Sequence, residues 1–431
     1  HTMQNLRKFL FDNEAVVGIQ SPSDYLYIQI VRFSMKCVNS WPSKEIGEKE
    51  SKLGTLLISI FILIMACTNF FGGVFYIWFR GNNLDFMDIG YAYITTLVDS
   101  VILSRLLTLT YSAKYRKVAK EFLTRIHLFY FKDVSEYAMK THKQVHLISH
   151  IITFSLAIQT VAVTLLFHAI PLYNYYSSGL YKQSGIKNMT FETTLFFISY
   201  FNICDYFYRI LLIFFNIFSV RTIMALFWLC MFDLFLSLMV FHLWGHFKIL
   251  LHKLNTFPRP SAQPSTMLLS CEKYSKTELE TVNEILKDCI DNHKNIVRFT
   301  NELSEAFGAM LFAYYTFHQI CGCLLLLECS QMTAKTLMRY LPMSVLFYQQ
   351  FIQLSIIFEL IGSTSEKLKH AVYGLPWEIM DVKNRKTVLI FLMNVQEPIH
   401  LKALGIANVG VTSMATILRN SLSYFTFLRS I

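Results

Sequence analysis

The chain has 431 residues, of which 54% are hydrophobic and only 16% are charged. Soluble domains usually carry about 25% charged residues, so this composition excludes an ordinary soluble enzyme and a disordered chain. The formal net charge is +10. The positions of the basic residues are informative, because in membrane proteins Lys and Arg mark the cytoplasmic side.

The N-terminal stretch precedes any apolar run. Met3 is the expected start, and the polar residues after it lack the apolar core and cleavage site of a signal peptide. We therefore predict a cytoplasmic N-terminal segment over residues 3–52 and an uncleaved first span.

Seven apolar stretches are long enough to cross a bilayer, which takes about 20 residues in a helix. They cover residues 53–79, 88–111, 147–172, 195–251, 306–328, 340–361 and 404–428. The stretch 195–251 has room for two spans, but no Gly or Pro interrupts it between Ile203 and Trp244. We predict transmembrane helices 1–4 within 53–251, helices 5 and 6 within 303–361, and helix 7 within 403–431.

The basic residues decide between seven and eight spans. With seven, the Lys and Arg residues outside the spans divide 29 to 6 between the two sides. An eighth span would place two basic connectors on the wrong side. The positive-inside rule thus predicts an all-α, seven-transmembrane-helix protein with a cytoplasmic N-terminus and an extracellular C-terminus. Asn188, in the sequon Asn188-Met189-Thr190, would then be an external glycosylation site.

The cytoplasmic connectors carry helical signals of their own. In residues 279–298, within the connector 252–302, apolar residues recur at the spacing of an amphipathic helix. Residues 387–395, within the connector 362–402, are apolar but too short to span. Together with the inner ends of the spans, they predict an intracellular helical anchor domain.

The last span carries a polar stripe. Ser413, Thr416, Asn420 and Ser423 recur at helical spacing, and the series continues to Phe427 and then to Ser430 or Ile431. Such a stripe, closed by a bulky apolar residue, is typical of a pore wall with a hydrophobic gate. Hydrogen bonding between helices explains the same spacing and is the commoner use of Ser and Thr in membranes.

Other reactive residues give no catalytic or cofactor signal. His242 and His246 have a metal-compatible spacing, but no nearby Cys or carboxylate completes a site, so helix packing is the better interpretation. The nine cysteines include no paired CxxC motifs; an external pairing of Cys204 with Cys329 stays open. We predict no cofactor, no enzyme activity and no nucleic-acid binding.

Seven spans first suggest a G-protein-coupled receptor, but the predicted orientation is inverted. The third span does not end in the triplet Asp-Arg-Tyr of that class, and the seventh lacks its motif Asn-Pro-x-x-Tyr. The C-terminal third instead resembles insect odorant receptors. The similarity rests on Ser365-Glu366-Lys367-Leu368, Tyr373, Pro376-Trp377, Gln396-Glu397-Pro398 and the final Ser423-Tyr424-Phe425-Thr426-Phe427-Leu428-Arg429. A narrower similarity to the moth sex-pheromone-receptor group rests on residues 241–250 and 254–260.

The resemblance implies the odorant-binding subunit of a ligand-gated, non-selective cation channel. It implies a heterotetramer with the odorant co-receptor, Orco, in the plasma membrane of the olfactory sensory neuron dendrite. The partners would be a volatile hydrophobic odorant, monovalent and divalent cations, and membrane lipid. It also favours the pore interpretation of the last helix, with the gate at Phe427 and Ile431.

The resemblance further implies a ligand pocket in the outer halves of spans two, three, four and six. Apolar and aromatic walls with a few donors suit a long volatile molecule. Aromatic residues also form interface belts whatever the function. The candidate lining residues are Met87, Tyr91, Ile94, Ile158, Leu165, His168, Tyr206, Ile210, Phe214, Ile217, Met343, Phe347, Tyr348 and Phe351.

Two alternatives remain open at this point. Within the same family, the ligand would be a general or plant volatile instead of a moth sex pheromone. In another class, a secondary transporter would need coupling carboxylates near the midplane, for which Asp233 and Glu359 are the candidates.

Overall fold

The computed structural model describes residues 19–37, 39–48, 52–83, 86–165, 231–260, 274–330 and 334–430. Nearly all of these residues are helical. The strands among them form one short antiparallel ribbon, in which β1 (Lys402–Ala403) pairs with β2 (Ala407–Asn408). The expected all-α class is therefore confirmed apart from this ribbon.

The described N-terminal half contains three long helices and a group of short ones. Local caps set several starts: the Ser112 hydroxyl accepts the Tyr115 N–H, and the Ser135 hydroxyl accepts the Ala138 N–H. The elements are η2 (Pro22–Asp24), α2 (Leu26–Cys37), α3 (Ser43–Ile46), α4 (Lys52–Arg80), η3 (Gly81–Asn83), α5 (Phe86–Tyr111), α6 (Ala113–Glu121), η4 (Phe122–Ile126), η5 (Leu128–Phe131) and α7 (Glu136–Thr164).

The C-terminal half contains the longest helix. A capping box of Ser275 and Glu278 starts α10 (Lys276–Cys329), which runs for 54 residues. The other elements are the helix Met231–Asn255, α11 (Ala334–Ser365), α12 (Lys367–Tyr373), η10 (Trp377–Ile379), α13 (Val382–Asn394) and α14 (Val411–Ser430).

Three predicted boundaries do not coincide with helix ends. The boundary between connector and span at residues 302 and 303 falls inside α10, so the amphipathic helix and the fifth predicted span are one helix. The helix that contains the third predicted span begins at Glu136, well before residue 147. The start of the last span, residues 404–410, belongs to the β-ribbon region instead of α14. In the first two cases the helix continues past the expected boundary, and in the third the backbone turns before the helix begins. Hydropathy alone gives no signal of either.

Six described helices are long and apolar enough to cross a membrane: α4, α5, α7, the helix Met231–Asn255, α10 and α11. The predicted seventh, α14, has the length but is not among them. Its polar residues lower its hydropathy. The choice between one and two spans within 195–251 depends on residues that lie outside the described ranges.

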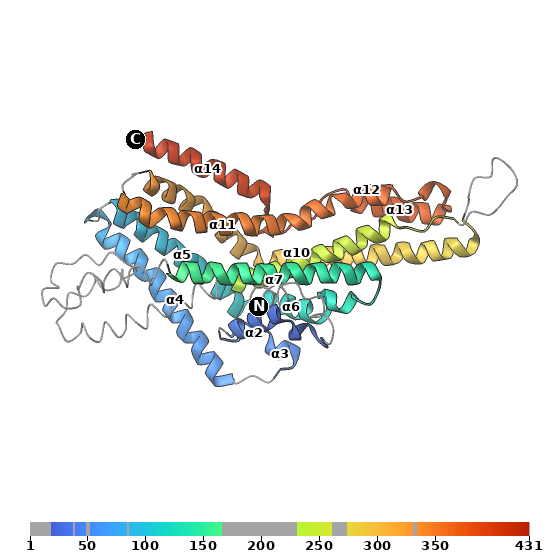
Figure 1. The fold of residues 1–431 in the computed structure, drawn as a ribbon, viewed down its shortest axis with the longest axis horizontal. Helices are drawn as coiled ribbons and strands as arrows, with labels where there is room; N and C mark the ends of the chain where they lie inside the picture. The colour runs from blue at the N-terminus through green and yellow to red at the C-terminus, as the bar shows by residue number, and fades with distance from the viewer. Residues whose placement is uncertain are drawn as a thin grey trace, which may run out of the picture.

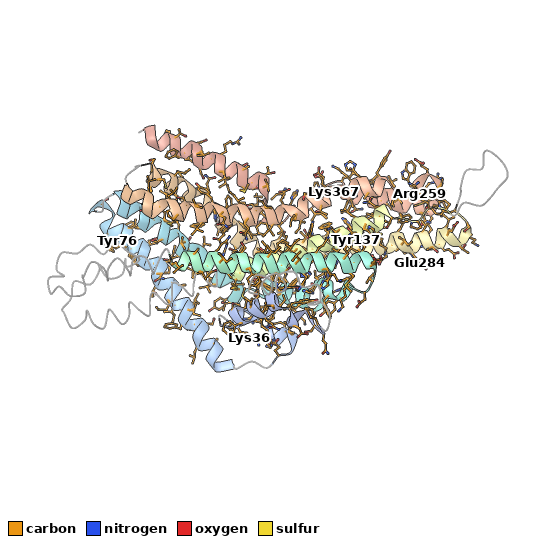
Figure 2. All side chains as sticks on the ribbon, viewed as in Figure 1. Lys36, Tyr76, Tyr137, Arg259, Glu284 and Lys367 are labelled. Carbon is orange, nitrogen blue, oxygen red and sulfur yellow. The ribbon has the colours of Figure 1, made fainter. Side chains whose placement is uncertain are left out.

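The molecule is elongated along these helices (Figure 1). Tyr76 lies at one end, whereas Arg259 and Glu284 lie at the opposite end (Figure 2). At that second end, the start of α10 packs against α13, which also contacts α12. Asn384 on α13 donates to the Leu279 carbonyl on α10 at 3.1 Å, and His293 contacts Phe391 edge to face. These are the helices expected in the anchor domain, and we call this end the inner end.

Candidate functional site

An aromatic cluster joins α10 to α11, and His318 is its centre. The imidazole stacks on Phe347 (ring centroids 4.4 Å apart) and on Phe351 (4.3 Å). Tyr314 and Phe317 pack around it at 4.2 and 5.0 Å. We call these five residues the aromatic cluster. Such ring pairs are worth about 0.5–1.5 kcal/mol beyond their buried area.

Helical spacing explains how the sequence gathers these rings. Positions 314, 317 and 318 share one face of α10, and positions 347 and 351 share one face of α11. His318 Nδ1 donates to the Tyr314 carbonyl one turn earlier, at 2.9 Å. In the neutral ring, that bond selects the Nδ1–H tautomer and leaves Nε2 as a hydrogen-bond acceptor.

A buried ion pair lies beside the cluster. Arg105 on α5 and Asp233 approach to 2.9 Å, and each side chain is only 3% exposed. Gln350 on α11 donates to the second carboxylate oxygen at 2.9 Å. The guanidinium also lies over the Tyr314 ring, 5.1 Å from its centroid. Buried charges are costly unless they are paired, so this network fixes three helices relative to one another.

The same ion pair bears on the transporter alternative. That function would need Asp233 to exchange protons or bind a coupling ion. Asp233 is instead engaged by Arg105 and Gln350. Glu359, the second candidate, accepts the Val411 N–H at the start of α14, at 3.0 Å.

Close contacts around Gly322 connect α11 to α14. The Tyr348 hydroxyl donates to the Gly322 carbonyl at 3.0 Å. A Cβ added to Gly322 would lie 3.0 Å from that hydroxyl and 3.1 Å from the Ser421 Oγ of α14. Gln319 also donates to Ser421 at 3.4 Å. The missing side chain of Gly322 therefore lets three helices meet at one point.

The polar stripe of α14 lies mostly away from the rest of the chain. Ser421 is buried, but Thr416 and Ser423 are exposed and donate to carbonyls of their own helix at 3.0 Å. Phe427 is 61% exposed. Ser413 and Asn420 are half-buried. Among the described residues, Thr416 and Ser423 thus hydrogen-bond only within their own helix.

The structure brings together part of the predicted pocket. Phe347 and Phe351 belong to the aromatic cluster, Tyr348 adjoins it, and Ile94 and Met343 pack in the same core. Met87 and Tyr91 belong to α5, and Ser430 ends α14. The other predicted residues lie outside the described ranges: His168, Tyr206, Ile210, Phe214, Ile217, Ile431 and the glycosylation residue Asn188.

Two predicted pocket residues are exposed within this chain. Ile158 on α7 is 69% exposed, and Leu165, the residue after α7, is 51% exposed. The inward face of α7 instead presents Gln159, whose amide donates to Gln353 of α11 at 2.8 Å. The place of Ile158 and Leu165 in the pocket stays a prediction, because exposed apolar side chains are also stable against lipid.

Sequence reasoning missed the contribution of α10. Tyr314, Phe317 and His318 lie in the fifth apolar run, which was not assigned to the pocket. A histidine within an apolar run was the available signal, because such residues usually face the protein interior. Arg105, the partner of Asp233, was also missed, although it too is an ionisable residue within an apolar run.

A second polar cluster lies nearer the inner end, where α2 meets η5 and α7. Tyr25 contacts His142 at 2.8 Å, and Tyr27 contacts His127 Nε2 at 3.3 Å. Burial lowers the pKa of His127 well below its usual range, and nearby imidazoles add to the effect. His242 accepts the Leu128 N–H at 3.1 Å, so this predicted metal-spaced histidine has a packing contact.

The comparisons with known proteins agree on one family. Odorant receptors 85d (putative) and 67a of Drosophila melanogaster are 25% and 26% identical over 151 and 150 residues. Each match covers 34% of this chain and 36% of the relative, so the chain spans about a third of their length. The solved olfactory receptor OR5 of Machilis hrabei, in complex with eugenol, has a TM-score of 0.69 over 100% of both chains at 13% identity.

That whole-length likeness shows the fold of an insect olfactory receptor, which confirms the predicted fold class. The profile of the 7tm odorant receptor family matches residues 92–422, well over half of the chain. The family is one of receptors, in agreement with the expectation of a non-enzymatic protein. The chain therefore belongs to the odorant receptor family.

Proposed function

We propose that this receptor is the odorant-tuning subunit of a ligand-gated, non-selective cation channel. It would work in the plasma membrane as a heterotetramer with the co-receptor Orco. The observation that carries the proposal is the pairing of two features in one chain. The aromatic cluster lies between α10 and α11, and α14, which contacts both, leaves Thr416 and Ser423 of its polar stripe exposed.

The aromatic cluster is the proposed odorant site. Its rings supply polarisable apolar walls, and His318 Nε2 supplies one acceptor for an alcohol head group. Tyr348, next to the cluster, supplies a hydroxyl. A long apolar volatile with a single oxygenated end fits this chemistry, and a moth sex pheromone is the ligand class we propose. A general or plant volatile would use the same contacts.

The pore is proposed along α14. Ser413, Thr416, Asn420 and Ser423 would face the permeating cations, and Phe427 with Ile431 would form the constriction. Support comes from the exposure of Thr416, Ser423 and Phe427 within the single chain. A hydrophobic ring excludes water when narrow and conducts when widened.

Gly322 is the proposed link between site and pore. Ligand stabilises the open state only if it binds that state better than the closed one. A ligand beside Phe347 would shift α11 at Tyr348, one residue further along. Tyr348 contacts the Gly322 carbonyl, and Gly322 adjoins Ser421 of α14. A displacement of α11 is thereby passed to the pore helix.

The test is co-expression with Orco in oocytes and current recording across a panel of volatile esters, aldehydes and alcohols. We expect a dose-dependent inward cation current. The variant Phe347→Ala should reduce potency at least tenfold, because it removes one wall of the site. The variant Ile158→Ala is the matched control, since its side chain is exposed on α7. Silence across the panel, or equal loss in both variants, would contradict the proposal.

The orientation is part of the same proposal: a cytoplasmic N-terminus and an extracellular C-terminus. The 29 to 6 division of basic residues supports it. Removing the sequon with Asn188→Gln should abolish a glycosidase-sensitive mobility shift of the expressed receptor. An unglycosylated wild type, together with an N-terminal tag accessible from outside intact cells, would reverse the orientation.

A further inference from the structure

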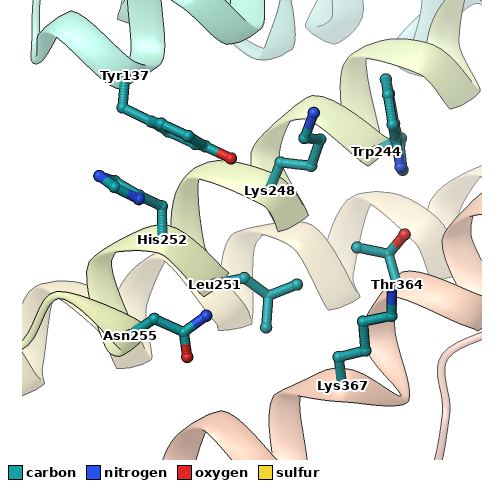
Figure 3. A pocket seen from close by; sticks show the side chains of 8 residues that line it. All are labelled: Tyr137, Trp244, Lys248, Leu251, His252, Asn255, Thr364 and Lys367. Carbon is teal, nitrogen blue, oxygen red and sulfur yellow. The ribbon is translucent and has the colours of Figure 1, made fainter.

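A hollow of about 280 Å³ lies toward the inner end, between α7, the helix Met231–Asn255 and the junction of α11 with α12. It is separate from the aromatic cluster. Figure 3 shows its lining side chains, which come from all three of these elements. They are Tyr137, Trp244, Lys248, Leu251, His252, Asn255, Thr364 and Lys367.

The lining is basic and contains no acidic residue. Lys248 is held by neutral partners: its ammonium donates to the Gln144 amide oxygen at 2.6 Å and lies 4.7 Å from the centroid of the Trp244 ring. Lys367 has no ion pair among the described residues. Lys140 of α7 is near enough to Lys248 to repel it. Cations gathered without a carboxylate favour an anionic occupant.

A neighbouring lysine on the same helix makes the contrast sharper. Lys253, five residues after Lys248, forms an ion pair with Asp288 of α10 and does not line the hollow. The chain therefore neutralises one lysine of this helix with its own carboxylate but leaves Lys248 to a neutral amide and a ring. The remaining polar groups of the lining, on Asn255 and Thr364, are suited to hydroxyl or phosphate oxygens.

Aromatic residues complete the chemistry. Tyr137 stacks on His252 with ring centroids 3.7 Å apart, and Trp244 lies on the same helix two turns earlier. Trp and Tyr are enriched where a helix leaves the hydrocarbon layer. Basic pockets between membrane helices on the cytoplasmic side bind phosphorylated lipid head groups. The volume is at the small end for a ligand site, which suits a head group more than a whole lipid.

We propose that this hollow, the basic pocket, binds a phosphate monoester carried by a lipid of the cytoplasmic leaflet. The proposal rests on the proposed orientation, which puts this end of the helices in the cytoplasm. Lys248 and Lys367 would hold the phosphate, and Tyr137 and Trp244 would border the sugar or inositol ring. The pocket joins α7 to the α11–α12 junction, so its occupant would brace these helices.

The experiment measures binding to the full-length receptor, co-purified with Orco in detergent, by native mass spectrometry. The probes are dioctanoyl phosphatidylinositol 4,5-bisphosphate, dioctanoyl phosphatidylcholine, inositol trisphosphate and inorganic phosphate. Each lysine near a membrane surface is worth roughly fivefold in affinity for an anionic lipid, so K248Q/K367Q should bind the bisphosphate lipid about 25-fold more weakly. The variant Lys253→Gln is the control and should bind as wild type does.

Each outcome of the binding experiment either supports or overturns the proposed site. Loss confined to K248Q/K367Q supports the pocket, and weak competition by inositol trisphosphate assigns it to a membrane lipid instead of a free phosphate. Competition by inositol trisphosphate at equal concentration overturns the lipid assignment. Equal binding by wild type and K248Q/K367Q, or equal loss in Lys253→Gln, overturns the site. Because no current is recorded, a failure here is distinct from a failure of the channel proposal.

Discussion

The helix Met231–Asn255 and α4 show opposite relations between apolarity and burial. α4 is the more apolar of the two, yet only 11% of its most apolar window is buried inside the chain. For the helix Met231–Asn255 the share is 72%. The buried helix carries Asp233, Ser237 and His242, which as whole residues are at most 2% exposed. In a membrane, therefore, polar residues mark the protein interior, because lipid satisfies apolar side chains equally well.

The variant Asp233→Ala, on the buried helix Met231–Asn255, should have the largest effect on stability. It removes the carboxylate that engages Arg105 and Gln350. Losing one partner of a buried ion pair costs about 3–5 kcal/mol. Thermal unfolding of the purified receptor, followed by tryptophan fluorescence, should show a large fall in Tm. The double variant R105M/D233L should recover part of the loss; a Tm unchanged in Asp233→Ala would refute the structural role of the pair.

The variant Gly322→Ala tests the point where the packed helices meet α14. The added Cβ would lie 3.0–3.1 Å from Tyr348 Oη and Ser421 Oγ, closer than ordinary contact, and overpacking costs about 1–3 kcal/mol. We expect a higher basal current and about a tenfold change in odorant potency. Gly81→Ala is the control, because its Cβ would meet only ordinary contacts at 3.6 and 3.9 Å. Identical currents in both variants would contradict coupling through Gly322.

The pH dependence of stability tests the buried cluster near the inner end. The pKa of His127 is lowered by burial, so the folded ring stays neutral while the unfolded ring gains a proton below about pH 6.5. Stability should fall as pH drops, with His127 contributing about 1.4 kcal/mol of the loss at pH 5.5. Compared with wild type, His127→Gln should show a flatter dependence of Tm on pH. His370→Gln, on an exposed position of α12, should leave the slope unchanged.

The variant Leu422→Ala should have the smallest effect on the single chain. This α14 side chain is 54% exposed, so its truncation should change the free energy of unfolding by less than about 0.5 kcal/mol. We expect instead a lower yield of co-purified Orco, because the exposed side of α14 is the proposed subunit and pore side. A fall in the Tm of the receptor alone, as large as that of a core variant, would contradict this.

The comparison also explains which features were predictable. Hydropathy and charge placed α4, α5, α11 and the short α13 nearly where the structure has them. Hydropathy could not place Ile158, whose apolar side chain is stable in lipid. Hydropathy also could not reveal that α10 continues across the expected boundary, because it reports the polarity of residues and not the continuity of the backbone. No proline interrupts α10 there.

The aromatic cluster was half predictable for a similar reason. Phe347 and Phe351 follow from the family resemblance and from their spacing on one face. His318 required knowing that α10 faces α11 at that level, which is a tertiary fact. Arg105 and Asp233 are 128 residues apart in the sequence, and nothing local in either segment identifies the other as its partner.

The unbroken length of α10 has a mechanical consequence. At 1.5 Å per residue its 54 residues form a rod about 80 Å long. The Leu404 N–H donates to the Gly308 carbonyl at 3.1 Å, and a Cβ at Gly308 would press on this backbone, so the rod is held closely near its middle. With Gly308 as fulcrum, Gly322 lies about 21 Å along one arm. A tilt of about 5° would move Gly322 by roughly 2 Å and the far start of α10 by about 4 Å in the opposite direction. A sideways push on α10 beside the proposed odorant site would thus become a larger, reversed movement at the start of the helix.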